Sequence, residues 1–130
     1  MEKILIIEDE QAITTLLKEA LIREGFTPIT AKNGKVGVEL AFKNHPSLIL
    51  LDLIMPEMDG MSALEIIRSD SWGKNVPVII LTNLNADTEK TVEDMMRFKP
   101  QFYLIKSDWK IVDIVKKVKE ELEKSKRLMK

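Results

Sequence analysis

The chain has 130 residues, of which 45% are hydrophobic and 32% are charged, a composition that indicates one folded domain and excludes a disordered chain. Lysine and arginine total 20 and aspartate and glutamate total 21, so the net charge of -1 excludes a global attraction to nucleic acid or to an anionic membrane. The absence of cysteine excludes disulfide scaffolds, cysteine-ligated zinc and thiol nucleophiles, and it agrees with a reducing cytosol.

The N-terminal residues show neither a signal peptide nor a membrane span. The chain passes from Met1 through Glu2 and Lys3 into a short apolar run. No stretch approaches the roughly 18 to 20 continuous apolar residues that a membrane helix needs. We therefore expect a cytoplasmic protein that does not enter a membrane.

The first predicted elements are a strand, a helix and a second strand. Lys3 to Ile7 is an apolar run without alternation, which indicates a strand covered on both faces. Apolar residues then recur at helical spacing from Ala12 to Leu21, and Gly25 suits the helix end because it lacks a Cβ. The second strand is predicted over Phe26 to Thr30.

The middle of the chain repeats this pattern. Val36 to Ala41 marks a second helix that ends before His45-Pro46, because a proline disfavours helical dihedrals in the preceding residue. Leu48 to Leu51 is a third strand, again without alternation. The apolar spacing from Met61 to Arg68 marks a third helix, which is expected to stop near Trp72-Gly73.

Two more strands and two more helices complete the chain. Strands are predicted over Val76 to Leu81 and Phe102 to Ile105. Between them, Asp87 to Phe98 is expected to form a helix that is only partly anchored, because it has few aliphatic residues. After Ser107, which suits a helix N-cap, the apolar stripe from Ile111 to Leu122 predicts a long final helix.

Five successive units of strand and helix, without a change in composition, predict an α/β fold. The expected architecture is one open, doubly wound parallel sheet of five strands with helices on both faces. In such sheets ligands bind at the carboxyl ends of the strands, where the strand order reverses. The loops at that edge should therefore carry the function.

Three carboxylates are expected to meet at this edge. Glu8 and Asp9 follow the first strand, and Asp52 follows the third. Like charges packed closely are costly unless a cation or a proton neutralises them, and an all-oxygen site suits Mg²⁺. Each acid taken alone is better explained as a loop or helix cap, so the metal hypothesis depends on the three together.

A hydroxyl and an ammonium group join the acids at the same edge. Thr82 ends the fourth strand and Lys106 ends the fifth. A carboxylate, a divalent cation, an ammonium and a hydroxyl can together receive a phosphoryl group, because one group attacks phosphorus while the others neutralise its equatorial oxygens. Asp52 is the expected nucleophile because its strand is central in the sheet.

The segment from Leu50 to Gly60, with its Met55-Pro56 and Met58-Asp59-Gly60 elements, resembles the phosphoacceptor segment of the receiver domains of two-component response regulators. The resemblance extends from Lys3 to about Leu122. It implies a (βα)5 flavodoxin-like fold with strand order 2-1-3-4-5. It further implies a receiver domain over residues 1–122, followed by the charged end of the last helix over residues 123–130.

The resemblance also implies a phosphoryl donor and a cofactor. Asp52 would accept a phosphoryl group from a sensor histidine kinase or a phosphotransfer protein, and the cofactor would be Mg²⁺. Asp9, Asp52 and the backbone carbonyl of Ile54 would bind the metal, and Glu8 would contribute to its water shell.

The same resemblance implies how the domain signals. Thr82 and Lys106 would contact the phosphoryl oxygens, Thr82 would move toward them, and Tyr103 would turn inward as the second switch residue. The change would alter the face made by the fourth helix, fifth strand and fifth helix, where a downstream protein partner binds. Dimerisation through the fourth and fifth helices is common in this family, so the resemblance also allows a homodimer of this chain. No enzyme activity is expected beyond self-phosphotransfer and slow self-dephosphorylation.

Two apolar residues predict that the phosphorylated state is long-lived. Ile54 and Leu84 lie two residues beyond Asp52 and Thr82, at positions that in this family flank the path of the hydrolytic water. Neither side chain can form a hydrogen bond to an attacking water. We therefore expect slow self-dephosphorylation.

Two other functions fit parts of this sequence less well. Ser107 follows Lys106 where the family usually has proline, and Asn83 follows Thr82 where it prefers a small residue, which leaves open an interaction module that signals without phosphorylation. A metal-dependent phosphatase is disfavoured because Ile54 stands where such an enzyme needs a second aspartate.

Direct nucleic-acid binding is not expected. Residues 110–130 hold eight basic and four acidic side chains, a net charge of +4. A helix end of this composition is usually a solvated face, and it carries no aromatic residue on which a base could stack.

Overall fold

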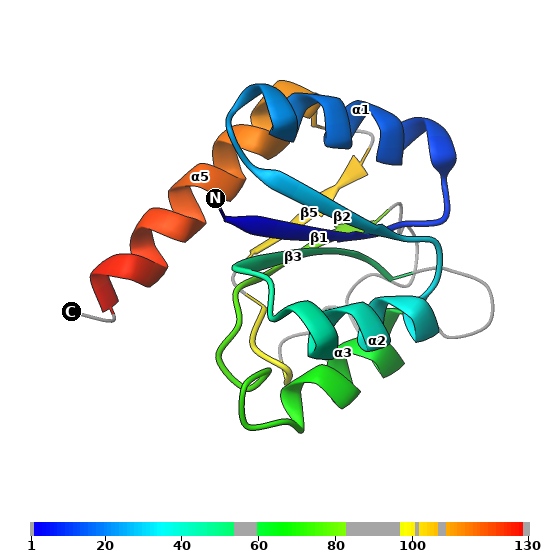
Figure 1. The fold of residues 1–130 in the computed structure, drawn as a ribbon, viewed down its shortest axis with the longest axis vertical. Coiled ribbons are helices and arrows are strands. Elements are labelled where there is room, and N and C mark those ends of the chain that lie inside the picture. The colour runs from blue at the N-terminus through cyan, green and yellow to red at the C-terminus, as the bar shows by residue number, and fades with distance from the viewer. Residues whose placement is uncertain (1, 54–59, 83–96, 101, 107–108, 129–130) are drawn as a thin grey trace.

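The fold is a five-stranded parallel sheet with helices on both faces (Figure 1). The structure is a computed structural model that describes residues 2–53, 60–82, 97–100, 102–106 and 109–128, with only the backbone described at Thr82, Ile105 and Leu128. Its elements are β1 (Lys3–Ile7), α1 (Gln11–Arg23), β2 (Thr27–Ala31), α2 (Gly34–Asn44), β3 (Leu48–Asp52), α3 (Gly60–Arg68), β4 (Val78–Thr82), β5 (Phe102–Ile105) and α5 (Ile111–Leu128).

The order of the strands is β2-β1-β3-β4-β5, and each neighbouring pair is parallel. This confirms the predicted doubly wound α/β fold and its 2-1-3-4-5 order. The strand bounds differ from the predicted ones by at most two residues. The largest difference is at β4, which begins at Val78 instead of Val76, because Pro77 has no N–H to donate to the sheet.

Two apolar clusters, one on each face of the sheet, hold the helices. The helices α1 and α5 cover one face, and α2 and α3 cover the other (Figure 1). Side chains of a strand alternate between faces, so Ile4 and Ile6 join the first cluster while Leu5 and Ile7 join the second. Each such side chain stabilises the fold by about 1.5–3 kcal/mol when fully buried. The central strands are therefore a rigid support for the loops at their ends.

The first two helices end where the sequence predicts. Gly25 follows α1 with a φ of +87°, a conformation that favours glycine because it has no Cβ. His45, with a φ of 45°, ends α2 directly before Pro46. At the start of α2, the side chain of Asn33 accepts a hydrogen bond of 2.9 Å from the backbone N–H of Val36.

The predicted start of the last helix is wrong. Helix α5 begins at Ile111, whereas a helix capped by Ser107 would begin at residue 108. Ser107 itself lies outside the described residues. The backbone N–H of Trp109 donates to the carbonyl of Lys106 at 3.4 Å, and its ring packs edge-on against Phe102 with centroids 6.1 Å apart. The contact with Phe102, the first residue of β5, packs the chain back against this strand before the helix begins.

The last helix extends past the sheet (Figure 1). It runs without a break to Leu128, so residues 123–128 continue the helix. Within the described ranges, two ion pairs join it to other parts of the chain, one of 2.6 Å between Lys119 and Glu24 and one of 2.7 Å between Lys126 and Glu2. Such exposed pairs contribute little to stability.

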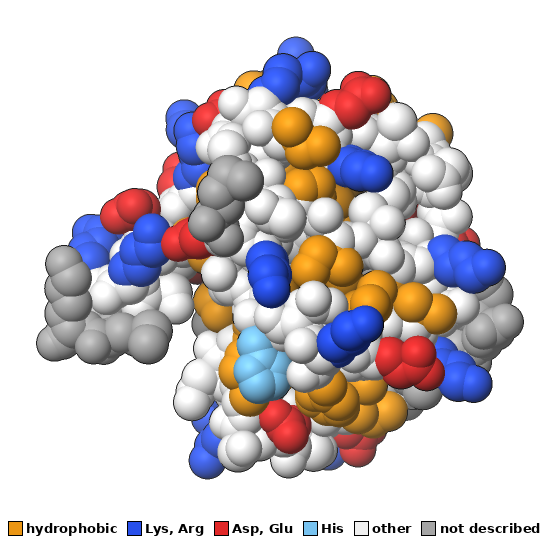
Figure 2. Space-filling model, in the orientation of Figure 1, with side chains coloured by type: hydrophobic (Ala, Val, Ile, Leu, Met, Phe, Trp, Pro, Cys, Tyr) orange, Lys and Arg blue, Asp and Glu red, His pale blue; other side chains and the backbone are white. Residues whose placement is uncertain are grey.

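Basic and acidic side chains are interspersed on the face of the molecule that Figure 2 shows.

None of the helices in the described ranges is both long enough and apolar enough to cross a membrane. The predicted helix over Asp87 to Phe98 lies outside the described residues except for Arg97 and Phe98, which form a turn, so it stays a prediction.

Arg68, at the end of α3, connects three parts of the fold. Its guanidinium group donates to the backbone carbonyls of Gly73 and Val76, both at 2.7 Å. It also donates to those of Phe98 and Lys99, at 2.7 and 3.1 Å. Arginine can do this because it has five donors in a rigid fork. The side chain thus ties α3 to the segments that lead into β4 and β5.

Replacing Arg68 by methionine is expected to lower the free energy of unfolding by about 3 kcal/mol, because four carbonyls, three of them in part-buried hydrogen bonds, lose a charged donor. Arg68→Lys should recover only part of the loss, because an ammonium group cannot span four carbonyls. Urea denaturation measures both effects. The exposed Arg23 offers a control, and Arg23→Met should change stability by no more than about 0.5 kcal/mol. A loss for Arg68→Met equal to that of the control would contradict this role.

Candidate functional site

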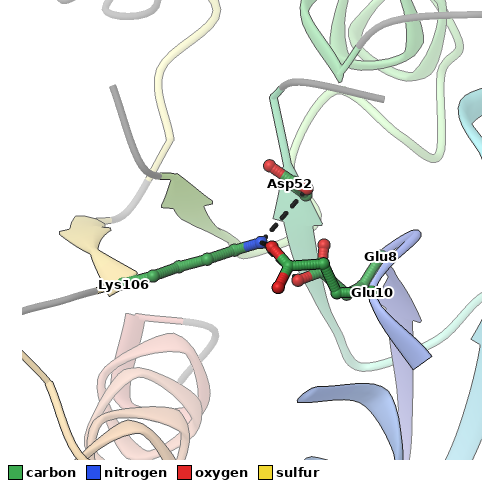
Figure 3. Close-up of polar contacts among 4 residues, drawn as sticks. All are labelled: Glu8, Glu10, Asp52 and Lys106. Carbon is green, nitrogen blue, oxygen red and sulfur yellow. Dashed lines mark hydrogen bonds and ion pairs between the residues drawn. The ribbon is translucent and has the colours of Figure 1, made fainter. Parts of the chain in front are cut away.

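The carboxyl ends of three strands bring four of the predicted site residues together. Glu8 and Asp9 follow β1, Asp52 is the last residue of β3, and Lys106 follows β5. The strands are parallel and their ends are in register. Side chains from distant parts of the chain therefore meet at one edge of the sheet, as Figure 3 shows for three of them.

Lys106 is at the centre of the hydrogen bonds in this site (Figure 3). Its Nζ donates to Oε1 of Glu8, to Oε1 of Glu10 at 3.1 Å and to Oδ2 of Asp52 at 3.2 Å. Only 7% of the Lys106 side chain and 4% of the Asp52 side chain are exposed. Burial alone would lower the pKa of Lys106, but the carboxylates outweigh it and the net effect is a raised pKa. The ammonium group therefore stays charged at neutral pH.

The three predicted acids form a cluster. Carboxylate oxygens of Glu8, Asp9 and Asp52 all lie within 4.8 Å of one another. The pKa of Glu8 is raised to about 8, first because its carboxylate is buried and then because Asp52 lies beside it, although Lys106 acts in the opposite direction. Desolvation, followed by the influence of Asp52, also raises the pKa of Asp9. The cluster therefore retains a proton at neutral pH unless a cation takes its place.

The donor set of this cluster fits Mg²⁺. Its candidate ligand atoms are all carboxylate oxygens, which Mg²⁺ prefers. The buried Oε2 of Glu8 has no hydrogen-bond partner among the described residues, an arrangement that is costly in a protein interior. A divalent cation held by Glu8, Asp9 and Asp52, or a water of its shell, would provide that partner. The carbonyl of Ile54, the other predicted ligand, lies outside the described residues.

Gly60 allows α3 to begin against the backbone of Asp52. Its N–H donates to the carbonyl of Leu53 at 2.9 Å. A Cβ on Gly60 would lie 2.2 Å from the backbone oxygen of Asp52, closer than real contacts allow. Any side chain here would displace either the helix or the end of β3. The glycine of the Met-Asp-Gly element therefore has a steric role beside the site.

The other predicted site residues are described only in part. Thr82 is the last residue of β4 and pairs with Ile105, but its side chain lies outside the described part of the structure. Ile54 and Leu84 lie outside it altogether. Tyr103 lies in β5 and is 37% exposed, so its ring is at the protein surface. Its function as a switch stays a prediction.

Glu10 is a site residue that the strand-end pattern does not predict. It is the third acid of the run Glu8-Asp9-Glu10, and its carboxylate is bonded to Lys106, which lies 96 residues away in the chain. The run of three acids was the available signal. An acid at the start of a helix is ordinarily explained by the helix dipole, so the ion pair becomes visible only in the structure.

A family model and curated relatives both assign this chain to one family. The family described as "Response regulator receiver domain" matches residues 4–119. "Transcriptional regulatory protein SrrA" of Staphylococcus aureus is 42% identical over 88 residues, which are 68% of this chain and 35% of that protein. "Probable transcriptional regulator ycf27" of Galdieria sulphuraria is 38% identical over 89 residues, which are 68% of this chain and 34% of that protein. The chain thus spans about a third of the length of these curated relatives.

Solved structures share the fold along nearly the whole chain. The receiver domain of the Francisella response regulator 1452 is 29% identical, with a TM-score of 0.83, and the match covers 96% of this chain and 99% of that one. A CheY-like response regulator receiver domain protein from Methanospirillum hungatei has a TM-score of 0.89 over 98% of each chain. Its identity of 23% supports the fold alone.

Mg²⁺ is expected to stabilise the protein more at about pH 9 than at about pH 6. The pKa of Glu8 is about 8 in the folded protein and about 4.3 in an unfolded chain, so between these values the folded state binds an extra proton. The free energy of unfolding of the metal-free protein therefore falls as the pH rises through this window. Mg²⁺ competes with that proton and offsets the loss. Thermal denaturation with and without Mg²⁺ at both pH values measures the effect.

Two variants control this experiment. Glu8→Gln removes the titrating group, so the difference between the two pH values should shrink. Glu39→Gln, which changes an exposed glutamate of α2, should behave like the wild type. An equal increase in melting temperature with Mg²⁺ at both pH values, in the wild type, would show that the prediction is wrong.

Proposed function

The chain belongs to the family of response regulator receiver domains, and we propose that it accepts a phosphoryl group on Asp52 in a Mg²⁺-dependent reaction and then signals to a protein partner. Receiver domains of two-component systems partner with histidine kinases and downstream effectors. The contact of the buried Asp52 with Lys106, within a cluster of three carboxylates, is the observation that carries the proposal. The donor would be a sensor histidine kinase or a phosphotransfer protein.

Phosphoryl transfer proceeds by in-line displacement. A carboxylate oxygen of Asp52 forms a bond to phosphorus while the bond from phosphorus to the donor's histidine nitrogen breaks. That nitrogen leaves with the bonding electron pair and takes up a proton. Lys106 neutralises negative charge on the phosphoryl oxygens. Mg²⁺ held by Glu8, Asp9 and Asp52 supplies further positive charge beside them when it is bound.

Burial makes these charges effective. Asp52 and Lys106 are almost fully shielded from solvent, and electrostatic interactions strengthen where water is excluded. The raised pKa of Lys106 keeps its charge available. A neutral group at this position would leave the transferred oxygens without their fixed cation, so the lysine contributes to the reaction and to the stability of its product.

The readout that we propose is the face that the family resemblance assigns to the fourth helix, β5 and α5. Of residues 87–98, which are predicted to form that helix, only 97 and 98 are among the described residues. A phosphoryl group on Asp52 adds charge and strong hydrogen-bond acceptors beside the ends of β4 and β5. Thr82 would move toward these acceptors, and Tyr103, now at the surface, would turn inward behind it. This change biases a two-state surface. A downstream protein partner, or a second copy of the chain, would bind it.

We also infer that the protein is cytoplasmic and that this domain does not bind nucleic acid directly. The absence of cysteine supports the cytoplasm. The relatives are named as transcriptional regulators, but the interspersed charges on the face in Figure 2 offer no basic patch there for a phosphate backbone. On this proposal, a protein that joined this domain to further domains would contact DNA through those other domains.

Incubation with acetyl phosphate and Mg²⁺ is expected to add one phosphoryl group to the wild type and none to Asp52→Asn, because the amide is not a nucleophile of this kind. Intact-mass spectrometry measures the gain, and omission of Mg²⁺ should abolish it. Labelling of Asp52→Asn at the wild-type rate would eliminate Asp52 as the acceptor. Failure of the wild type with both acetyl phosphate and a panel of histidine kinases would favour an interaction module that signals without phosphorylation.

The phosphorylated protein is expected to hydrolyse slowly, because Ile54 and Leu84 cannot hold an attacking water. Ile54→Asn and Leu84→Glu should each accelerate the loss of the phosphoryl group by about tenfold, which is less than the roughly 10²-fold to 10⁴-fold that a positioned general acid or base supplies. The decay of the phosphorylated mass after removal of the donor measures this rate. Ile54→Val keeps the site apolar and should leave the rate unchanged. Unaltered decay in both polar variants would rule out this explanation.

A further inference from the structure

We propose that Glu10 is a positioning residue that restrains Lys106 and thereby weakens the hold of the site on a phosphoryl group. The inference rests on the proposed function and extends it to the control of reactivity. Glu10 lies outside the set of residues that the family resemblance assigns to the site. Its effect would be exerted through Lys106 and not through contact with the reacting atoms.

The ion pair between Glu10 and Lys106 is direct. Oε1 of Glu10 lies 3.1 Å from Nζ of Lys106, about as close as the 3.2 Å contact with Asp52 (Figure 3). An ammonium group has three N–H donors, and Glu8, Glu10 and Asp52 provide three carboxylate acceptors for them. The charge of Lys106 is therefore shared among three acids before any phosphoryl group arrives.

The Glu10 side chain is not used by the helix that it precedes. Glu10 is the N-cap residue of α1, with an extended backbone, yet its side chain makes no capping hydrogen bond. A capping side chain would accept from the free N–H groups of the first turn. The carboxylate is instead directed to Lys106, which supports a role in the site over a role in helix stability.

Glu10 also differs from the other partners of Lys106. Glu8 and Asp52 belong to the carboxylate cluster that fits a divalent cation, and Glu10 does not. A cation bound at that cluster would therefore neutralise Glu8 and Asp52 directly but would not be bound by Glu10. Glu10 is also the most exposed of the three partners, with 50% of its side chain accessible against 1% for Glu8 and 4% for Asp52. Its charge can therefore be changed with little effect on the buried core.

The consequence is a weaker electrostatic hold on the phosphoryl group. Lys106 must neutralise the phosphoryl oxygens, and an anion 3.1 Å from its nitrogen cancels part of that charge. Removing this contact should strengthen the binding of a phosphoryl analogue. Because Glu10 is half exposed, we expect an increase in affinity of about twofold to fivefold, the range that corresponds to a partly exposed ion pair.

The test uses beryllofluoride, which mimics a phosphoryl group on an aspartate, in the presence of Mg²⁺. Its affinity is measured by tryptophan fluorescence for the wild type, Glu10→Gln, Glu10→Asp and Glu19→Gln. Glu10→Gln removes the charge. Glu10→Asp keeps the charge but withdraws it from Lys106 by one methylene, and Glu19→Gln makes the same change of net charge at an exposed position of α1. Both Glu10 variants should bind more tightly, and Glu19→Gln should match the wild type.

Three results would overturn the inference. The first is an unchanged affinity in Glu10→Gln. The second is tighter binding in Glu10→Gln with wild-type binding in Glu10→Asp, which would mean that general negative charge matters and the contact does not. The third is a change in Mg²⁺ affinity of Glu10→Gln as large as the change in beryllofluoride affinity, which would place Glu10 with the metal ligands. Wild-type protein that gains no phosphoryl group would instead count against the proposed function itself.

Discussion

The imbalance of charge around Asp52 is the constraint on which the rest of the site depends. Two buried carboxylates, those of Glu8 and Asp52, lie beside Asp9 and share one ammonium group, that of Lys106. Such a set is unfavourable when every acid is ionised. It is relieved by a proton or by a divalent cation, whose positive charge would also offset the negative charge of an incoming phosphoryl group. Affinity for Mg²⁺ and capacity for phosphoryl transfer would thus have one electrostatic origin.

A charge cluster of this kind persists only if the backbone cannot relax away from it. Apolar packing on both faces of the sheet fixes the central strands. Gly60 lets α3 begin against the backbone of Asp52. Arg68 ties the end of α3 to the segments that enter β4 and β5. The fold therefore holds the acids and the lysine at positions that they would not adopt in a flexible chain, and this preorganisation is what transfer of charge to a buried site requires.

Glu10 adds a level of control that is separate from the chemistry. The buried residues of the site are constrained by packing and by one another, so changing any of them alters several properties together. An exposed carboxylate on Lys106 can vary without disturbing the core. On our proposal, the reactivity of Asp52 and the lifetime of its phosphorylated form would be tuned from two places, the surface ion pair at Glu10 and the apolar residues Ile54 and Leu84.

Local patterns in the sequence determined the strands and the ends of the first two helices, because burial on both faces, helical spacing and turn residues act over a few neighbouring residues. The strand ends in turn determined that four site residues lie at one edge of the sheet: Glu8, Asp9, Asp52 and Lys106. The packing of Trp109 against Phe102, directly before α5, could not be predicted in this way. The same holds for the hydrogen bonds from Arg68 to the carbonyls of Phe98 and Lys99, which are 30 and 31 residues away in the chain. It also holds for the pairing of Glu10 with Lys106, which are 96 residues apart. Only tertiary structure decided these contacts, because no local periodicity encodes the distance between residues that the fold alone brings together.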